Sequence, residues 1–347
     1  MLIENPVTQS AVPLRVLWVH NFDPGIPVSG VFMHKLADAV QALGVRVDML
    51  YTGNLSNPIE VWRARSHLRW LAPEFDVVHA QYGSMCAWIA SAAPARKLLS
   101  IRGSDWYNTD SGPWSERRHG MMANFLTRRA IPRYDHVVTM SERMRRDIQN
   151  HFANAGPAAP AIEVLTDGLS LSDFVPLDRT QCRAALGFAG DERPWVLVTS
   201  VFEDNPVKRI GLARAAVEEA RTQIPDIQIK VATNVSHTDM PIWMSACNLT
   251  LMTSLHEGWP NAIKEGLACG IPFVATDISD LPEIAKEEPS CVIAADNPQD
   301  LGRAIVYSLQ HPPQTDLRRF VQHMDLQRVA YRLCEIYFEM VTHPCAA

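Results

Sequence analysis

One short stretch near residue 260 restricts the fold of this chain more than any other part of the sequence. It opens with an apolar run, Leu249–Met252, that is typical of a buried parallel strand and is followed by a loop. A helix is predicted over about Asn261–Ala268, because Gly270 and Pro272 stop it. The apolar run Phe273–Ala275 is predicted as the next strand. Strand, loop, helix and strand make one βαβ unit, which indicates an α/β fold with a parallel sheet.

Two glutamates occupy positions in this βαβ unit where side chains reach ligands. Glu257 lies in the loop at the carboxyl end of the first strand, the edge at which open α/β sheets bind ligands. Glu265 lies one turn into the helix, whose start presents free N–H groups and a positive dipole end. Gly258 has no side chain, so a ligand can approach the backbone closely. The alternative interpretation is that both glutamates are ordinary solvated surface residues.

The same stretch resembles the family-4 glycosyltransferases of the GT-B fold. Glu257 and Glu265 fall on the two acids of that family's E-x7-E motif, and the intervening GWPNAIK and the following LACGIPFVATDISDLPEI are similar to its usual sequence. The resemblance implies that Glu265 binds the ribose hydroxyls of a nucleotide sugar. It also implies that Glu257 contacts the sugar hydroxyls, assisted by the donor-binding loop residues Gly258, Pro260 and Asn261.

This resemblance predicts an α/β protein with two Rossmann-like domains that face each other across a cleft, with the donor bound between them, mostly by the second. We expect an acceptor domain over residues 1–175, a nucleotide-sugar donor domain over 176–323, and a C-terminal helix at 324–347 that crosses back to the first domain. The 347 residues suffice for two domains with cores of their own. Besides the two strands above, strands are predicted at Val16–His20, Val45–Tyr51, Asp76–Ala80, Leu98–Ile101, Val137–Met140, Ile162–Leu165, Trp195–Val201 and Ile227–Ala232.

The composition is that of a soluble globular protein, with 47% hydrophobic and 20% charged residues. A formal net charge of −6 argues against general nucleic-acid binding. No apolar run approaches the length of a membrane span, and the first residues lack the pattern of a signal peptide. The seven cysteines form no C-x-x-C pair, and most have apolar neighbours, so we expect buried thiols in a reducing, cytoplasmic compartment. They are Cys86, Cys182, Cys247, Cys269, Cys291, Cys334 and Cys345.

A loop after the first predicted strand is a candidate phosphate cradle. Gly30 opens an amphipathic helix that Gly44 ends, and the start of a helix can bind phosphate through its free N–H groups. Such loops are common, so the feature alone is weakly specific. Family-4 glycosyltransferases have a glycine-bearing loop here, near the donor phosphate and the acceptor, and many have two adjacent glycines where this chain has Ser29 and Gly30. The resemblance therefore implies that Gly30 contacts the donor.

The segment from Arg102 to Asp105 follows a predicted strand and resembles the family's H-G-x-D segment. Asp105 matches the acid of that segment, and Arg102 stands where histidine is frequent. A histidine can titrate near neutral pH, whereas arginine remains charged, so Arg102 can hold an anion but cannot relay a proton.

Several nearby side chains have two interpretations. His79 could be a catalytic group or a core histidine with a hydrogen bond, and we favour the second. Trp106, Tyr107 and Trp114 could form a wall that stacks on sugar rings or could be ordinary packing residues, and the sequence leaves both open.

Two further segments match the family with substitutions. Asp167, in a stretch similar to the family's connection between domains, replaces the usual asparagine. The family grips the diphosphate with an arginine and, five residues later, a lysine. Lys208 matches the lysine, but Glu203 occupies the arginine position, and Arg209 is the candidate substitute.

Residues 115–150 hold the main concentration of arginine, interleaved with Met121, Met122 and Phe125. The favoured interpretation is an amphipathic helix with a solvated face. The alternative is a surface that meets anionic lipid headgroups at the inner face of a membrane. The arginines are Arg117, Arg118, Arg128, Arg129, Arg133, Arg143, Arg145 and Arg146.

Several other function classes lack their signatures. No G-x-G occurs, so the dinucleotide fingerprint is absent, and no G-K-[ST] phosphate loop or G-x-S-x-G elbow is present. The chain also has no D-x-D, the usual metal-binding signature of the other glycosyltransferase fold. We therefore expect no metal and no cofactor other than the nucleotide sugar, which is a substrate.

Together these features predict a retaining glycosyltransferase that moves a sugar from a nucleotide diphosphate to a glycan, a lipid-linked glycan or a small molecule, in the synthesis of cell-surface polysaccharide or glycolipid. The candidate catalytic residues are Glu257, Lys208, Asp105 and Arg102, and Lys208, Arg209 and Gly30 are candidates for holding the diphosphate. Two alternatives remain: a sugar-nucleotide epimerase of the same fold, and a non-catalytic partner subunit that retains the fold.

Overall fold

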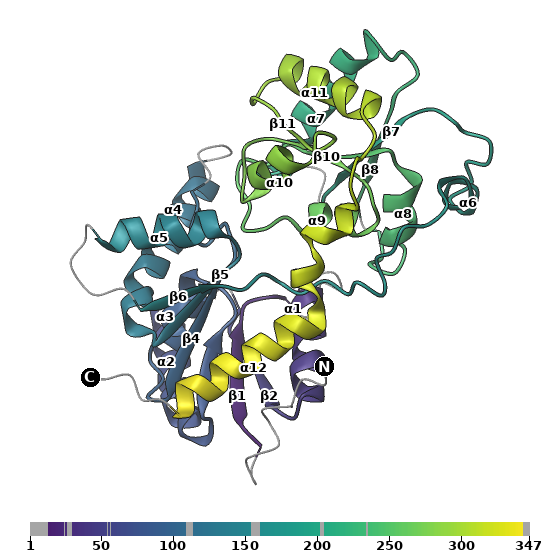
Figure 1. Ribbon diagram of the computed structural model, residues 1–347. Helices are drawn as coiled ribbons and strands as arrows, with labels where there is room; N and C mark the ends of the chain where they lie inside the picture. The colour runs from purple at the N-terminus through teal and green to yellow at the C-terminus, as the bar shows by residue number, and fades with distance from the viewer. Residues whose placement is uncertain are drawn as a thin grey trace. The chain divides into compact units, whose positions relative to one another are not determined.

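The computed structural model describes residues 13–23, 25, 30–53, 55, 57–108, 114–153, 160–201, 205–233 and 235–342. The chain divides into two compact units (Figure 1). Unit 1 comprises Met1–Gly168 together with Leu326–Ala347, and unit 2 comprises Leu169–Asp325.

Unit 1 is built on a six-stranded parallel sheet with the strand order β2-β1-β3-β4-β5-β6. Most residues of the central strands are buried, which is typical of a parallel sheet covered by helices on both faces. The strands are β1 (Arg15–His20), β2 (Arg46–Tyr51), β3 (Val77–Ala80), β4 (Arg96–Ile101), β5 (His136–Thr139) and β6 (Ala161–Val164).

Helices cover both faces of this sheet. One core packs α1 and α12 against the strands, and the other packs α2, α3, α4 and α5 against the opposite face (Figure 1). Short 3-10 turns, Ala72–Glu74 and Ile131–Arg133, follow α2 and α4. The helices are α1 (Val31–Ala42), α2 (Pro58–Leu71), α3 (Ser84–Ala90), α4 (Trp114–Ala130), α5 (Glu142–Ala153) and α12 (Leu326–Thr342).

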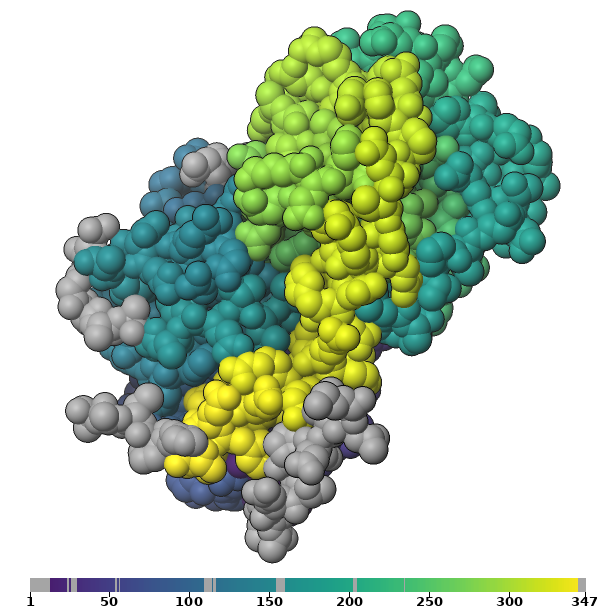
Figure 2. Space-filling view, viewed as in Figure 1, coloured from purple at the N-terminus to yellow at the C-terminus, as the bar shows by residue number. Residues whose placement is uncertain are grey.

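The C-terminal helix α12 packs on unit 1, as the sequence predicts, and forms part of its surface (Figure 2). The Tyr337 hydroxyl lies 2.6 Å from His79 Nδ1 and accepts a hydrogen bond of 2.9 Å from the Trp18 indole N–H. Arg332 binds both carboxylate oxygens of Glu163 on β6, at 2.7 and 2.9 Å. These contacts fix α12 to strands from the centre and the edge of the sheet.

Unit 2 contains a second parallel sheet with the strand order β11-β10-β9-β7-β8. Its strands are β7 (Trp195–Thr199), β8 (Gln228–Ala232), β9 (Leu249–Met252), β10 (Phe273–Ala275) and β11 (Val292–Ile293). Its helices are α6 (Arg179–Ala185), α7 (Ile210–Arg221), α8 (Met240–Ala246), α9 (Asn261–Ala268), α10 (Leu281–Glu287) and α11 (Pro298–Gln310), with 3-10 turns at Leu317–Phe320 and Gln322–Met324. Helices α7 and α11 pack together on one core with the strands.

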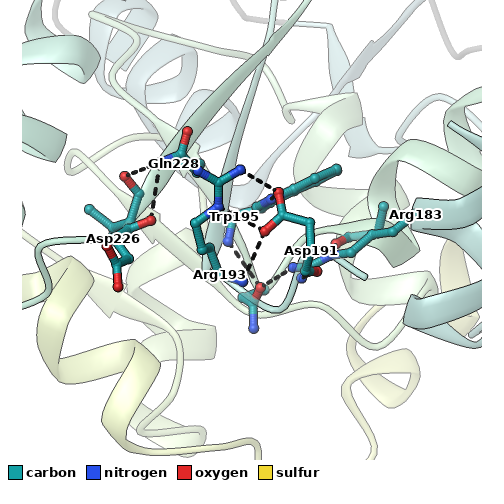
Figure 3. A network of polar contacts seen from close by, with 9 residues as sticks. Arg183, Asp191, Arg193, Trp195, Asp226 and Gln228 are labelled. Atoms are coloured by element: carbon teal, nitrogen blue, oxygen red, sulfur yellow. Dashed lines mark hydrogen bonds and ion pairs between the residues drawn. The ribbon is translucent and has the colours of Figure 1, made fainter. Parts of the chain in front are cut away.

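A network of polar contacts lies at the start of β7 in unit 2 (Figure 3). Arg193 forms an ion pair of 2.8 Å with Asp191, which also accepts a hydrogen bond of 3.2 Å from the Trp195 indole N–H. Arg183 on α6 places its guanidinium carbon 4.5 Å from the centre of a Trp195 ring and donates to Asn248 at 2.9 Å. Because Trp195 opens β7, the network lies at the amino ends of the strands, away from the carboxyl edge at which open α/β sheets bind ligands.

The structure confirms the predicted α/β class with two parallel sheets. All ten predicted strands are present, with bounds that differ by at most two residues. The βαβ unit around residue 260 has the predicted bounds in β9, α9 and β10. The short strand β11 is not among the predictions.

Candidate functional site

At the carboxyl ends of the strands of unit 2, two loops bring charged groups together. Lys208 lies in the loop between β7 and α7, and Glu257 lies in the loop between β9 and α9. Lys208 Nζ is 2.6 Å from Glu257 Oε1, so two residues that are 49 positions apart form an ion pair. The Ser254 hydroxyl donates to the same carboxylate oxygen at 2.8 Å. Both charged side chains keep about a fifth of their surface exposed, so a ligand can reach the pair.

Backbone hydrogen bonds hold these two loops beside each other. The Leu255 N–H donates to the Val207 carbonyl at 2.9 Å, and the Thr253 hydroxyl donates to the Lys208 carbonyl at 2.7 Å. The Lys208 and Glu257 side chains therefore project from a framework that is itself fixed, an arrangement that favours a defined geometry when a ligand binds.

Arg209 takes part in this framework. Its Nε donates to the Thr253 carbonyl at 2.7 Å, its Nη2 donates to the Ser254 carbonyl at 3.3 Å, and its Nη1 lies 2.5 Å from an Asp296 carboxylate oxygen. The Arg209 backbone is in the left-handed region, with φ of 51°, which is uncommon outside glycine. Arg209 thus connects three segments, and its predicted contact with a diphosphate would use a guanidinium that already has an acidic partner.

Glu265 lies on α9, buried, with 8% of its surface exposed. One of its carboxylate oxygens lies 3.5 Å from Nε2 of His237, and the His237 ring in turn packs edge-on against Phe174 with ring centres 5.1 Å apart. The Glu265 carboxylate thus lies on a helix, beside His237, where it can accept hydrogen bonds from the hydroxyls of a ligand.

The loop that leads into α9 contains the remaining predicted donor-binding residues. Gly258 and Pro260 are buried, Pro260 caps α9, and Asn261 is exposed as the first residue of the helix. The Ser279 hydroxyl donates to the Gly258 carbonyl at 2.6 Å, which fixes the turn. The first turn of α9 directs backbone N–H groups toward the same edge of the sheet as Lys208 and Glu257.

Burial lowers the pKa of His256, next to Glu257 in this loop, and the charge of Lys208 lowers it further, whereas Glu257 raises it. His256 is therefore neutral at neutral pH and does not offset the negative charge of its neighbour.

In unit 1, the predicted residues Arg102 and Asp105 lie together after β4. Arg102 forms an ion pair with Asp167, and it donates from Nε to the Gln81 carbonyl at 2.6 Å and from Nη2 to the Gln81 side chain at 2.9 Å. Burial lowers the pKa of Arg102 to about 10, although Asp105 and Tyr82 act to raise it, so the guanidinium remains charged at neutral pH.

Asp105 is fully buried and accepts hydrogen bonds from three backbone N–H groups, those of Gly83, Arg102 and Gly103, at 2.7 to 3.1 Å. Burial raises the pKa of its carboxyl group, and the three N–H donors act to lower it. This arrangement shapes the loop after β4, and a direct part for Asp105 in catalysis stays a prediction.

The structure places the other predicted groups of unit 1 as follows. His79 is buried, with Nε2 2.8 Å from the Ser100 hydroxyl and Nδ1 2.6 Å from the Tyr337 hydroxyl. These contacts confirm the favoured interpretation of His79 as a core histidine. Trp106 is also buried, whereas Trp114 is exposed on α4, so these two side chains do not form one wall.

Gly30 is the N-cap residue just before α1 and has φ of 70°, a left-handed conformation that favours glycine. A Cβ added at Gly30 would lie 3.0 Å from the Phe22 side chain, so a larger residue would displace that ring. Phe22 contacts Phe32 edge-on, and the Arg102 guanidinium lies 4.5 Å from the centre of the Phe32 ring. Gly30 and Arg102 therefore belong to one neighbourhood at the carboxyl edge of the first sheet.

Sequence reasoning misses several partners of the site residues. Ser254 could have been found from its place at the end of β9, but no local pattern connects His237 with Glu265 or Asp167 with Arg102, because these contacts join distant segments. Glu203 lies outside the residues that the structure describes. Within the described ranges, no group of three or more His, Cys, Asp or Glu side chains is arranged to hold a metal ion.

Two family models match this chain. The one described as "Glycosyl transferase 4-like domain" matches residues 36–161, and the one described as "Glycosyl transferases group 1" matches residues 207–311. The D-inositol 3-phosphate glycosyltransferase of Mycobacterium tuberculosis (strain ATCC 25618 / H37Rv) is 26% identical over 249 residues, which cover 61% of this chain and 49% of that protein. The chain thus spans about half the length of this curated relative.

Solved structures show the same fold. Sucrose-phosphate synthase (tll1590) from Thermosynechococcus elongatus matches with a TM-score of 0.73 at 15% identity, covering 95% of this chain and 99% of that chain. Alr3699/HepE from Anabaena, in complex with UDP and glucose, matches with a TM-score of 0.67 at 15% identity, covering 94% of this chain and 100% of that chain. At such identities the likeness concerns the fold alone.

Proposed function

The chain belongs to the family-4 glycosyltransferases of the GT-B fold, and we propose that it transfers a sugar from a nucleotide-diphosphate donor to an acceptor. The observation that carries this proposal is the contact of 2.6 Å between Lys208 and Glu257 at the carboxyl edge of the second sheet, next to the helix that holds Glu265. A cation and two carboxylates at this edge match the three parts of a nucleotide sugar: diphosphate, sugar and ribose.

Lys208 holds the leaving group in this account. When the bond between the anomeric carbon and the phosphate oxygen breaks, its electron pair stays on the diphosphate, whose negative charge therefore grows. An ammonium group that is already positioned stabilises that charge more strongly in the transition state than in the bound substrate. The N–H groups of the first turn of α9 support the same charge through the helix dipole.

The two glutamates take different parts of the donor. Glu257 orients the sugar through its hydroxyls, and its negative charge favours the positive charge that develops at the anomeric carbon. Glu265 binds the ribose hydroxyls through two charge-assisted hydrogen bonds. No protein nucleophile is required, and we expect the configuration at the anomeric carbon to be retained.

The comparisons support the donor class. UDP and glucose are bound in the Alr3699/HepE structure, and the Mycobacterium relative is named for the transfer of a glycosyl group to D-inositol 3-phosphate. For this chain the proposed acceptor is a glycan, a lipid-linked glycan or a small molecule, in the synthesis of cell-surface polysaccharide or glycolipid.

The test is a transfer assay with purified protein and a panel of nucleotide sugars, with D-inositol 3-phosphate and a lipid extract as acceptors. Release of the nucleoside diphosphate that depends on acceptor, and that falls in Lys208→Ala, supports the proposal. Donor that is converted to an isomer without acceptor would instead identify an epimerase. Donor binding without any turnover across the acceptor panel would favour a non-catalytic partner subunit.

A further inference from the structure

The most exposed large apolar side chains of the described residues all lie on two helices of unit 1. Seven such side chains on α2 and α4 are 55–72% exposed, whereas no other large apolar side chain in the described ranges exceeds 44%. A soluble protein gains nothing from exposing three tryptophans in one region, so this segregation points to a partner. The seven residues are Ile59, Trp62 and Trp70 on α2, and Trp114, Met121, Met122 and Phe125 on α4.

On α4 the exposed apolar side chains share one face with arginines. Trp114 and Arg118 are one turn apart, as are Phe125 and Arg129, and each guanidinium carbon lies 5.8 Å from the centre of its aromatic ring. The opposite face of α4 carries the buried Asn124 and packs toward the core. The outward face of α4 therefore carries exposed apolar side chains together with Arg118 and Arg129.

Helix α3 lies beside both α2 and α4 and joins them into one surface (Figure 1). The Trp88 ring on α3 has the guanidinium carbons of Arg65 from α2 and Arg133 from the turn after α4 at 4.7 and 4.8 Å from its centre. Burial lowers the pKa of Arg65, and the charges of Arg69 and Arg133 lower it further. Several positive charges thus lie close together between the two helices.

The local charge contrasts with that of the whole chain. Helices α2 and α4 and the turn Ile131–Arg133 contain eight arginines and only two acidic residues, Glu60 and Glu116, although the chain has a formal net charge of −6. The α5 arginines have acidic neighbours on their own helix. Arg145, for example, pairs with Glu142 at 2.8 Å. In the structure, the basic region therefore comprises α4 and α2 and does not extend over α5.

We propose that the exposed faces of α2 and α4, here called the α2–α4 surface, dock on an anionic lipid membrane. Arginines near such a surface are attracted to its phosphates, while tryptophan, phenylalanine and methionine side chains enter the boundary between headgroups and acyl chains. No helix in the described part of the chain is long and apolar enough to cross a bilayer.

The combination of arginines and exposed apolar side chains favours a lipid membrane over a nucleic acid or a second copy of this chain. A nucleic acid would pair with the arginines but would leave Ile59, Met121 and Met122 exposed to water. A second copy of this chain related by two-fold symmetry would place the same patch against itself, so arginines would face arginines. An anionic membrane satisfies both the charges and the apolar side chains.

The test measures binding of the purified full chain to vesicles by flotation, without donor or acceptor, so its result does not depend on the proposed transfer activity. Vesicles of phosphatidylcholine are compared with vesicles that also contain phosphatidylglycerol, at low and high salt. We expect binding to the anionic vesicles at low salt that weakens as salt screens the charges over about 8 Å. Each arginine should contribute about fivefold, so Arg63→Gln/Arg118→Gln/Arg129→Gln should weaken binding on the order of a hundredfold.

A second variant addresses the apolar side chains. Trp62→Ser/Met122→Ser/Phe125→Ser should reduce the binding that remains at high salt. The matched controls are Arg328→Gln and Val341→Ser on α12, which covers the opposite face of the same sheet and should leave binding unchanged. Circular dichroism melting of every variant separates loss of binding from loss of folding.

Three results would overturn the proposal. One is no binding to anionic vesicles at low salt. Another is binding to a DNA duplex as tight as to the vesicles, which would assign the surface to polyanions in general. The third is a dimer in light scattering that the apolar variant dissociates, which would assign the surface to a second copy of the chain.

Discussion

Arg102 and Asp167 form an ion pair within unit 1, with side chains only 8% and 14% exposed. Each residue by itself departs from the family pattern, in which a histidine is frequent at the first position and an asparagine is usual at the second. The contact accounts for both departures at once, because a buried arginine requires a compensating negative charge. Arg102 is thus held by a charge that the chain itself supplies.

This pair predicts strong coupling between the two positions. Asp167→Asn removes the ion-pair partner of the buried guanidinium, although Asp105 stays close to it, and should lower the free energy of unfolding by roughly 1–3 kcal/mol. The double variant Arg102→His/Asp167→Asn should lose less than the sum of the two single variants, by about 1–3 kcal/mol. Urea unfolding of all four proteins measures the coupling. Additive losses would mean that the contact does not stabilise the protein.

Lys208→Ala should damage catalysis more than Arg102→Ala. Lys208 contacts Glu257 and is placed to hold the leaving diphosphate, and loss of such a group typically costs about 2.7–4 kcal/mol, or on the order of 10²–10³ in rate. Arg102 is more deeply buried and is paired with Asp167, so we expect its removal to affect stability first. Values of kcat and KM for both variants, at a temperature where both are folded, decide the matter. If Arg102→Ala abolishes turnover and Lys208→Ala barely changes it, the diphosphate is held chiefly by unit 1.

Transfer should survive chelation of metal ions. Lys208 and the first turn of α9 supply positive charge and N–H donors where the diphosphate is expected, so a metal ion has no necessary part in neutralising it. The assay compares initial rates with and without EDTA. Complete loss of activity that magnesium or manganese restores would show that a metal takes part.

The protein should become less stable as the pH falls through about 6.5. Burial, with smaller effects of the Arg102 and His136 charges, keeps the pKa of His79 well below its usual value, so the folded protein binds fewer protons than the unfolded chain in this range. The stabilisation is therefore complete above pH 6.5 and is lost toward lower pH, with a slope of up to about 1.4 kcal/mol per pH unit for one histidine.

His79→Gln should flatten this dependence, because glutamine does not titrate. Unfolding by urea at several pH values measures the slope for the wild type and the variant. Equal slopes would mean that His79 does not contribute. The matched control is His119→Gln, because His119 is exposed on α4.

Much of the fold could be predicted because strand and helix signals are local. The apolar runs of β9 and β10 and the glycine and proline after α9 define their elements within a few residues of sequence. β11 has only two residues, Val292 and Ile293, both half-buried, which is shorter than the strands that a pattern of apolar residues identifies. Its pairing with β10 depends on the neighbouring strand rather than on its own sequence.

The candidate site could be predicted in part for the same reason. Glu257 and Glu265 belong to one local motif, whereas the Lys208–Glu257 contact joins residues in two different loops. The pairing of Arg102 with Asp167 spans 65 residues, and each looked like an isolated substitution in the sequence. The exposure of Trp62 and Trp70 on α2 was also hidden, because a tryptophan in a helix is more often part of a core.

The most direct test of the account is the affinity of the protein for nucleotide sugars with and without the Glu265 charge. Calorimetric titration of a panel of nucleoside diphosphates and their sugars should find a selective ligand for the wild type. Glu265→Gln should bind that ligand about ten- to a hundredfold more weakly, since a hydrogen bond to a charged group contributes roughly 1.5–3 kcal/mol. Glu218→Gln, an exposed glutamate on α7, is the control and should bind as the wild type does. Unchanged affinity in Glu265→Gln, or no binding of any member of the panel to the wild type, would contradict the account.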